Sequence, residues 1–269
     1  MATPHGTVVR TERLSDHMVR VVLGGEGLRG WAPNGFTDAY LVLWFPPADA
    51  PYAAPFDVES VKAGHPPERW PIHRHYTVRR WDAAAGELTI DFVVHGDEGV
   101  AGPWAASAQP GDRVVVSLPG GAYRPDPDAD FHLLVGDESA LPAIAASLEV
   151  LPAGRRATAV LVCDGPADEV PLDCPGDLEV IWCHRVGSAA AADLLLDAVR
   201  ALEWPAGRVD AFVHGEAGEV RGVRRHLLAD RGLDRAQLSA SGYWRRTMTD
   251  EAWRAVKRDW NADVERDVR

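Results

Sequence analysis

The feature that most constrains the fold is a change of sequence pattern near the middle of the chain. Before residue 126, short stretches rich in Val, Thr, Tyr, Phe and Trp follow one another, separated by Gly, Pro and Asp. Short strands without long helices between them favour an antiparallel barrel. After residue 130, continuous apolar stretches alternate with stretches of helical period, which is typical of a mostly parallel sheet. The 269 residues are enough for two domains.

We therefore predict a two-domain α+β protein whose first domain, residues 1–128, is a six-stranded antiparallel β-barrel. The Pro-rich stretch Pro46–Pro71 is not assigned to a strand or helix; a long unstructured insertion in a compact domain is usually functional or mobile. The linker between the domains falls at Asp126–Asp130. The six expected strands are Thr7–Arg13, Met18–Leu23, Ala39–Phe45, Arg74–Trp81, Glu87–His95 and Asp112–Leu118.

The second domain, residues 129–246, is expected to be a nucleotide-binding α/β domain with a parallel sheet. Its expected strands are Phe131–Gly136, Ala157–Cys163, Leu178–Cys183, Val209–His214 and Leu238–Tyr243, and its expected helices are Pro142–Leu151, Ala189–Leu202 and Val220–Ala229. Residues 247–269 are expected to form a C-terminal docking helix. Thr249 would cap this helix, and Trp253, Val256 and Trp260 would pack against the body.

Composition and charge narrow the functional classes. The formal net charge is −12, and no basic stripe is visible, which argues against nucleic-acid or anionic-membrane binding. The cysteines Cys163, Cys174 and Cys183 have no CxxC spacing, so neither a disulfide framework nor a zinc site is expected. His73 and His75 have metal-ligand spacing but no evident third ligand. No secretory leader or membrane-spanning run is visible, so the sequence predicts a cytoplasmic protein.

The segment from residue 73 to residue 79, HRHYTVR, combines groups that can hold a flavin nucleotide. On a strand, residues two apart share a face, so Arg74, Tyr76 and Val78 align. Tyr76 offers an aromatic plane and Thr77 a hydroxyl, and an arginine can bind a phosphate. An exposed barrel strand explains the same residues equally well.

Two glycine turns are the other candidate ligand sites. In the first, Gly96, Gly99 and Gly102 permit close backbone approach, and Pro103 suits a helix start, where free amides bind an anion. A plain tight turn is the alternative. In the second, Gly136 follows an apolar strand and Pro142 lies early in the next helix. That helix N-terminus would lie at the carboxyl edge of the sheet, where open α/β sheets bind pyrophosphate.

Taken in order, the motifs RxYTVR, HGDxG…W, PGD, GDESALPAI, GE and GYWRR resemble the siderophore-interacting protein family, over nearly the whole chain. These proteins are flavin-dependent ferric-siderophore reductases of the ferredoxin-reductase-like group. The resemblance implies that Arg74, Tyr76, Thr77, Val78, His95, Gly96, Gly99, Val100, Ala101, Gly102, Trp104 and Ala105 bind FAD. It also implies that Gly136, Asp137, Glu138, Ser139, Ala140, Gly215 and Glu216 lie near the nicotinamide nucleotide.

One segment departs from the family pattern. The family's turn reads close to GPASxWA, whereas this chain has Gly99-Val100-Ala101-Gly102-Pro103-Trp104-Ala105. The hydroxyl of the serine is missing, so backbone amides would have to hold the phosphate.

The resemblance also implies a chemistry. A nicotinamide donates two electrons and ferric iron accepts one, so a flavin is the natural adapter between them. Thr77 is expected near the flavin N5 as the catalytic, tuning residue. Many ferric siderophores are anionic, so Arg79, Arg245, Arg246 and Lys62 are expected to bind the substrate, with Arg245 favoured over Arg246.

The nicotinamide donor depends on two further residues. Asp164, at the end of the second strand of the α/β domain, would suit a ribose hydroxyl and hence NADH. Arg185 follows the next strand and could instead meet a 2′-phosphate. We expect NADPH to be favoured over NADH.

Two alternatives remain open at this stage. One is a general flavin reductase, or an electron-transfer partner of a ferredoxin or monooxygenase. The other is a siderophore- or flavin-binding protein with little turnover.

Overall fold

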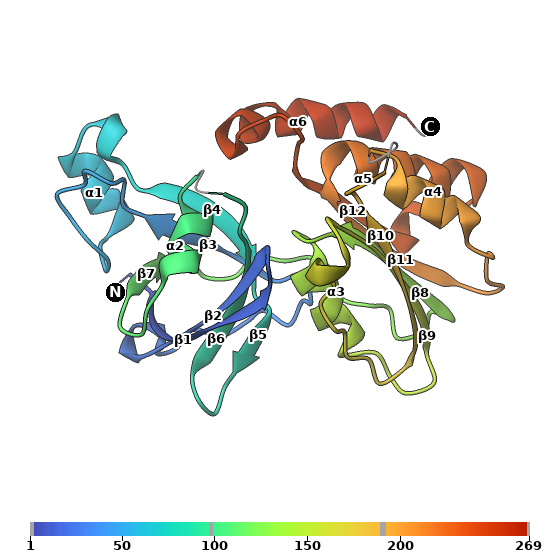
Figure 1. Ribbon diagram of the computed structural model, residues 1–269, viewed down its shortest axis with the longest axis horizontal. Helices are drawn as coiled ribbons and strands as arrows, with labels where there is room; N and C mark the ends of the chain where they lie inside the picture. Colours follow the sequence, from blue (N-terminus) through green and yellow to red (C-terminus); the bar gives the residue numbers. More distant parts are fainter. Residues whose placement is uncertain (1–2, 97–98, 189–191, 268–269) are drawn as a thin grey trace. The chain divides into compact units, whose positions relative to one another are not determined.

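The computed structural model describes residues 3–96, 99–188 and 192–267 of the chain. These residues form two compact units, Met1–Arg124 and Pro125–Arg269, each with its own sheet (Figure 1). Among the described residues, no helix has both the length and the apolar character needed to cross a membrane.

The first unit is a curled antiparallel sheet of seven strands in the order β4-β3-β7-β1-β2-β6-β5. The strands are β1 (His5–Ser15), β2 (Met18–Gly24), β3 (Tyr40–Phe45), β4 (Ile72–Thr77), β5 (Arg80–Asp82), β6 (Glu87–Val93) and β7 (Arg113–Val116). The curl brings β4, at one edge, against β6, next to the other edge, where the rings of Tyr76 and Phe92 lie 4.3 Å apart. The predicted antiparallel barrel is confirmed, but the predicted count of six strands is wrong.

The seventh strand arises because the expected strand Arg74–Trp81 is two strands. The N–H of Val78 still donates to Ala39 at 2.7 Å, whereas the N–H of Arg79 donates to Thr89 at 3.0 Å. The chain therefore changes partner between these two residues, leaving β4 paired with β3 and β5 paired with β6. The segment Arg74–Trp81 contains no glycine or proline to mark such a change.

The Pro-rich stretch Pro46–Pro71, which the sequence pattern left unassigned, has regular structure. It contains α1 (Val58–Gly64), which Asp57 caps by accepting a hydrogen bond from the N–H of Ser60 at 2.8 Å. Phe56 and Val61 pack with Val115 of β7 in a small core of their own. The helix cap and this small core stabilise the stretch, although its sequence has no regular hydrophobic period.

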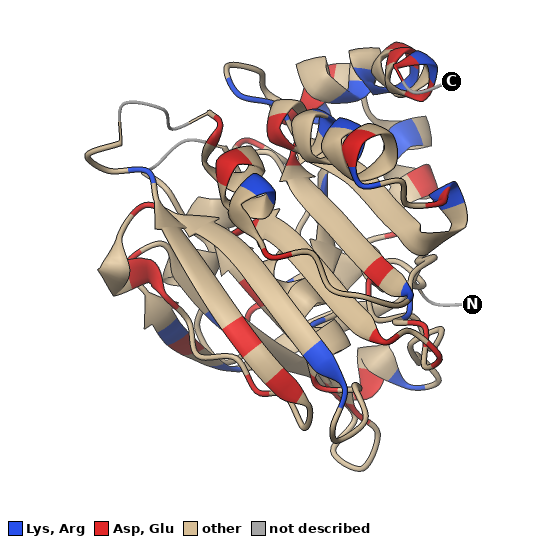
Figure 2. Ribbon diagram, turned by 90° about the vertical axis from the view of Figure 1, so that its right-hand side faces the viewer, with Lys and Arg blue, Asp and Glu red and all other residues tan. Residues whose placement is uncertain are grey.

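The second unit is a parallel sheet of five strands in the order β10-β9-β8-β11-β12. Its elements are β8 (Phe131–Asp137), α3 (Leu141–Leu148), β9 (Arg156–Cys163), β10 (Asp177–His184), α4 (Leu194–Ala201), β11 (Val209–Glu216), α5 (Ala217–Arg225), β12 (Leu238–Trp244) and α6 (Asp250–Arg266). Figure 2 shows its strands as mostly uncharged ribbons, in keeping with a buried parallel sheet. The strand order reverses between β8 and β11, and open α/β sheets bind ligands at such a switch point.

The helices of this unit match the predicted ones apart from their ends. Residues 189–191 of the expected second helix lie outside the described residues, and α4 begins at Leu194. The next helix, α5, starts at Ala217, three residues early, because Glu216 caps it. It continues as a π-helical turn over His226–Asp230.

The tail forms α6, capped by Thr249 as predicted. Trp253 is 1% exposed, and its ring lies 5.3 Å from that of Trp260. Val256 was expected to pack inward, but it is 41% exposed. The buried face instead follows Trp253, Trp260 and Val264, and Val256 lies off that line.

Candidate functional site

Two segments that the sequence assigns to a flavin lie against one core residue, Phe92, in the first unit. The Tyr76 ring of β4 is 4.3 Å from the Phe92 ring of β6. Trp104, on α2 (Ala101–Ser107), is 5.7 Å from Phe92 and 5.4 Å from Phe45 of β3. Phe92 is fully buried and thus supports both segments. Sequence analysis missed it, although the alternation of its strand points it into the barrel.

The four residues between Arg74 and Val78 that are expected to bind the flavin differ in exposure. Arg74 is half-buried, and its Nη1 donates to the carbonyl of His73 at 2.8 Å. Tyr76 is also half-buried. Thr77 is 7% exposed, and Val78 is buried in the barrel core. Arg74 and Tyr76 therefore present more side-chain surface to a ligand than Thr77 and Val78 do.

Two glycines lie before α2, in the segment predicted to bind a phosphate. Gly96 and Gly99 have positive φ angles of 55° and 80°, and a Cβ at either position would meet no atom within 4 Å. No side chain caps α2 within the described residues. Pro103 has no N–H and the Trp104 N–H donates to the Val100 carbonyl, so the N–H groups of Ala101 and Gly102 are the first-turn donors that an anion could use. The helix begins at Ala101, so Pro103 is not its first residue. Elsewhere in this segment His95 is exposed, Val100 and Gly102 are half-buried, and Ala101 and Ala105 are buried.

Two cations expected at the substrate site have acidic neighbours. The Arg79 guanidinium lies 3.8 Å from Asp91 and is 13% exposed. Asp91 also accepts from Arg20 at 2.7 and 2.8 Å. Lys62 of α1 pairs with Glu59 at 3.2 Å and is 38% exposed. Lys62 is therefore the more accessible of the two.

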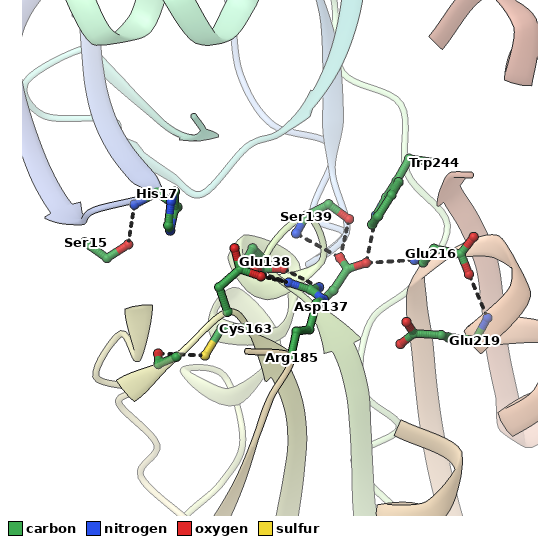
Figure 3. A network of polar contacts seen from close by, with 12 residues as sticks. Ser15, His17, Asp137, Glu138, Ser139, Cys163, Arg185, Glu216, Glu219 and Trp244 are labelled. Carbon is green, nitrogen blue, oxygen red and sulfur yellow. Dashed lines mark hydrogen bonds and ion pairs between the residues drawn. The ribbon is translucent and has the colours of Figure 1, made fainter. Parts of the chain in front are cut away.

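Asp137, the last residue of β8, connects three strand ends at the carboxyl edge of the second sheet (Figure 3). Its Oδ2 accepts from the backbone N–H of Glu216 and from the indole N–H of Trp244, both at 2.8 Å. Its Oδ1 accepts from the N–H of Ser139 at 2.9 Å and from the Ser139 hydroxyl. Asp137 is 1% exposed, so its contacts are with the chain itself. Trp244 was missed in the sequence because its partner lies 107 residues away.

Two glycines permit close packing at the switch point. A Cβ on Gly136 would lie 2.7 Å from the His214 carbonyl and from the Ala140 Cβ. Gly215 has a φ of 137°, and its Cβ would lie 2.7 Å from Asp137 Oδ2. Both positions therefore require glycine. Ala140, the N-cap of α3, is fully buried.

Glu216 and Glu219 hold the segment after β12. Glu216 accepts from the backbone N–H of Glu219 at 2.9 Å and from that of Arg246 at 3.0 Å. The Arg246 guanidinium donates to Glu219 at 2.7 Å. Arg245, in contrast, makes no side-chain hydrogen bond or ion pair with the described residues. The two arginines therefore differ in their partners, and the expectation that Arg245 binds a ligand stays a prediction.

The Glu219 carboxyl, which the sequence analysis missed, gives a pH prediction. Burial raises its pKa to about 7, together with the charge of Asp137 and against the effect of Arg246. The folded state thus holds an extra proton between about pH 4.5 and 7, and the stability that this group contributes falls as pH rises through that range. Because Gln mimics the protonated acid, Glu219→Gln is expected to match the wild type near pH 4 and to exceed its unfolding free energy by about 3 kcal/mol at pH 8.

Urea titrations of both proteins at several pH values measure this difference. Glu203→Gln, at an exposed position, is the control and should follow the wild type throughout. A constant offset between Glu219→Gln and the wild type across the pH range would contradict the prediction.

Arg185 and Glu138 form an ion pair at the same sheet edge. Arg185 Nη1 and Nη2 donate to the two carboxylate oxygens at 2.5 and 2.7 Å. Burial raises the pKa of Glu138, and Arg185 opposes that rise. The residue proposed for the 2′-phosphate thus has an acidic partner in this structure.

A curled antiparallel sheet followed by a five-stranded parallel sheet defines the ferredoxin-reductase-like class. Consistent with that fold, the structure superposes on a ferredoxin reductase of carbazole 1,9a-dioxygenase with a TM-score of 0.64 at 16% identity, covering 90% of this chain and 70% of the other. Family models match residues 7–123, described as a siderophore-interacting FAD-binding domain, and residues 129–247, described as a siderophore-interacting protein. The chain belongs to the siderophore-interacting protein family.

Individual relatives are similar over nearly their whole length. An uncharacterized protein of Mycobacterium tuberculosis is 45% identical, covering 94% of this chain and 93% of the relative. The ferric vibriobactin reductase of Vibrio cholerae is 34% identical, covering 91% and 90%. The NADPH-dependent ferric-chelate reductase of Escherichia coli is 33% identical, covering 88% and 91%. The crystal structure of a siderophore utilization protein from T. fusca matches with a TM-score of 0.77 at 40% identity, covering 93% and 97%.

Proposed function

We propose that this protein is an FAD-dependent reductase that takes electrons from NADPH or NADH and reduces a ferric siderophore, releasing ferrous iron. The observation that carries the proposal is the convergence of Tyr76 and the α2 segment on Phe92, within residues matched by the family's FAD-binding model. The ferric and ferric-chelate reductases among the relatives support the reaction. The cytoplasmic location expected from the sequence belongs to the same proposal, as does ferredoxin as an alternative donor.

In this proposal the protein supplies binding and orientation. When bound, FAD would supply the means to accept two electrons from the nicotinamide and to release them singly to ferric iron. Tyr76 would lie against its ring system. Arg74 and the N–H groups of Ala101 and Gly102 would bind its phosphate oxygens, and Thr77 would lie near its reactive nitrogen. The carboxyl edge of β8 and β11 binds the nicotinamide nucleotide, with Asp137 and Glu216 holding that edge in shape.

The Arg74 assignment predicts a loss of FAD affinity on substitution. Arg74→Ala removes one charge-assisted contact and should weaken FAD binding by about 1.5–3 kcal/mol. Quenching of FAD fluorescence on titration with apoprotein measures the affinity. Arg80→Ala, at an exposed position nearby, should bind FAD as the wild type does. Equal affinities for all three proteins would show that Arg74 does not bind the phosphate.

The substrate assignment predicts that the neighbouring arginines behave differently. Arg245→Ala should raise KM for an anionic ferric siderophore several-fold, and added salt should have the same effect on the wild type because it screens exposed charges. Arg246→Ala should leave this KM near normal, because Arg246 is bound to Glu219. Wild-type KM values in both variants would place both arginines outside the substrate site.

One assay separates the proposal from its alternatives. Purified protein, NADPH or NADH, and a ferric siderophore are mixed with a ferrous chelator, with and without free flavin. Ferrous chelate formed without free flavin supports a siderophore reductase. Reduction of free flavin with no iron release indicates a general flavin reductase, and siderophore binding without turnover indicates a binding protein.

A further inference from the structure

The carboxyl ends of three adjacent strands bring one arginine and two acids together. Glu138 follows β8, Asp164 follows β9 and Arg185 follows β10. Asp164 accepts from Arg185 Nη1 at 3.1 Å and is 44% exposed. The Glu138 side chain is 14% exposed and contacts both terminal nitrogens of the guanidinium (Figure 3).

Glu138 occupies the face of Arg185 that a phosphate needs. A guanidinium binds phosphate and carboxylate through the same planar pair of N–H groups. In Arg185 this pair faces Glu138, and the remaining Nε is buried without a partner in the described residues. A phosphate can therefore form its two-point contact with Arg185 only where Glu138 gives way.

We infer that Glu138 is a specificity-determining residue that competes with the adenosine 2′-phosphate for Arg185 and so lowers the preference for NADPH over NADH. The inference rests on the proposed nucleotide site at this edge. Arg185, Glu138 and Asp164 together carry one net negative charge when ionised, and a phosphate monoester carries about −1.5 to −2. NADH lacks the 2′-phosphate and does not meet this competition.

Binding of two adenine nucleotides by the FAD-loaded full chain tests the inference without relying on turnover. Titration calorimetry compares 2′,5′-ADP, which carries the 2′-phosphate, with 5′-ADP, which does not. Glu138→Gln should bind 2′,5′-ADP about five- to tenfold more tightly than the wild type, with 5′-ADP within about twofold. The ratio of kcat/KM for NADPH to that for NADH should rise by a similar factor.

Three further variants define the mechanism. Asp164→Asn should give a smaller gain, because Asp164 makes a single and more exposed contact. Arg185→Ala should reduce binding of 2′,5′-ADP to the level of 5′-ADP. Glu203→Gln, exposed and remote in sequence, should leave both affinities unchanged.

The outcomes separate the inference from the proposed function. An equal gain for both nucleotides in Glu138→Gln, no gain, or weaker binding of 2′,5′-ADP would overturn the inference while leaving a nucleotide site in place. Absence of binding by either nucleotide, together with no oxidation of NADPH or NADH, would overturn the inference and the proposed function together.

Discussion

Asp137→Ala is expected to lower the free energy of unfolding of the second unit by about 3–4 kcal/mol. The substitution removes a buried carboxylate that accepts hydrogen bonds from Ser139, Glu216 and Trp244. Each hydrogen bond to a charged group contributes about 1.5–3 kcal/mol, and buried donors left unpaired cost more than the mean bond. Relief of the buried charge offsets part of the sum.

Urea unfolding monitored by tryptophan fluorescence measures the loss. Asp259→Ala, at an exposed position on α6, is the matched control and should change stability by no more than about 0.5 kcal/mol. Binding of 5′-ADP should also weaken in Asp137→Ala, because the strand ends lose their common acceptor. Stability equal to that of the control would show that Asp137 does not hold the edge together.

Phe92→Ala is expected to destabilise the first unit by about 3–5 kcal/mol, the range for a large buried aromatic replaced by alanine. Phe92 is fully buried, and its ring supports Tyr76 and Trp104. The cavity should therefore also weaken FAD binding, although Phe92 itself need not contact the cofactor.

The control for this substitution is Phe36→Ala in the same unit, where the side chain is 41% exposed. It should change stability by no more than about 0.5 kcal/mol and should leave FAD affinity unchanged. If Phe92→Ala lowered stability but bound FAD as tightly as Phe36→Ala, then Phe92 would not hold Tyr76 and Trp104 in place for FAD binding.

The hydrophobic periodicity of the strands was sufficient to predict one antiparallel and one parallel sheet. A strand buried on one face alternates apolar and polar residues, whereas a strand buried on both faces is apolar throughout. The alternation in Leu88–Val94 indicates a strand with one buried face, and the continuous run Phe131–Gly136 indicates a strand covered on both. The change of hydrogen-bonded strand between Val78 and Arg79 could not be predicted from periodicity. The hydrogen bonds that change are made by backbone N–H and C=O groups, which do not depend on the side chain.

Some residues of the candidate site could likewise be predicted from the sequence, and others could not. Arg74, Tyr76 and the glycine turn were visible because their residue types are suited to a flavin nucleotide. The acceptor role of Asp137 and the hydrogen bond that Arg246 donates to Glu219 were not visible, because they join residues far apart in the chain. Only the fold brings β8, β11 and β12 to one edge. The residues that hold the site therefore required the structure.

The stoichiometry of iron release tests the central claim most directly. Under anaerobic conditions, the FAD-loaded protein is given a limiting amount of NADPH or NADH, an excess of ferric siderophore and a ferrous chelator. Because a nicotinamide supplies two electrons and ferric iron accepts one, we predict two ferrous ions for each nicotinamide oxidised, without free flavin. Oxidation of the nicotinamide with no ferrous iron, or ferrous iron only when free flavin is added, would contradict the account.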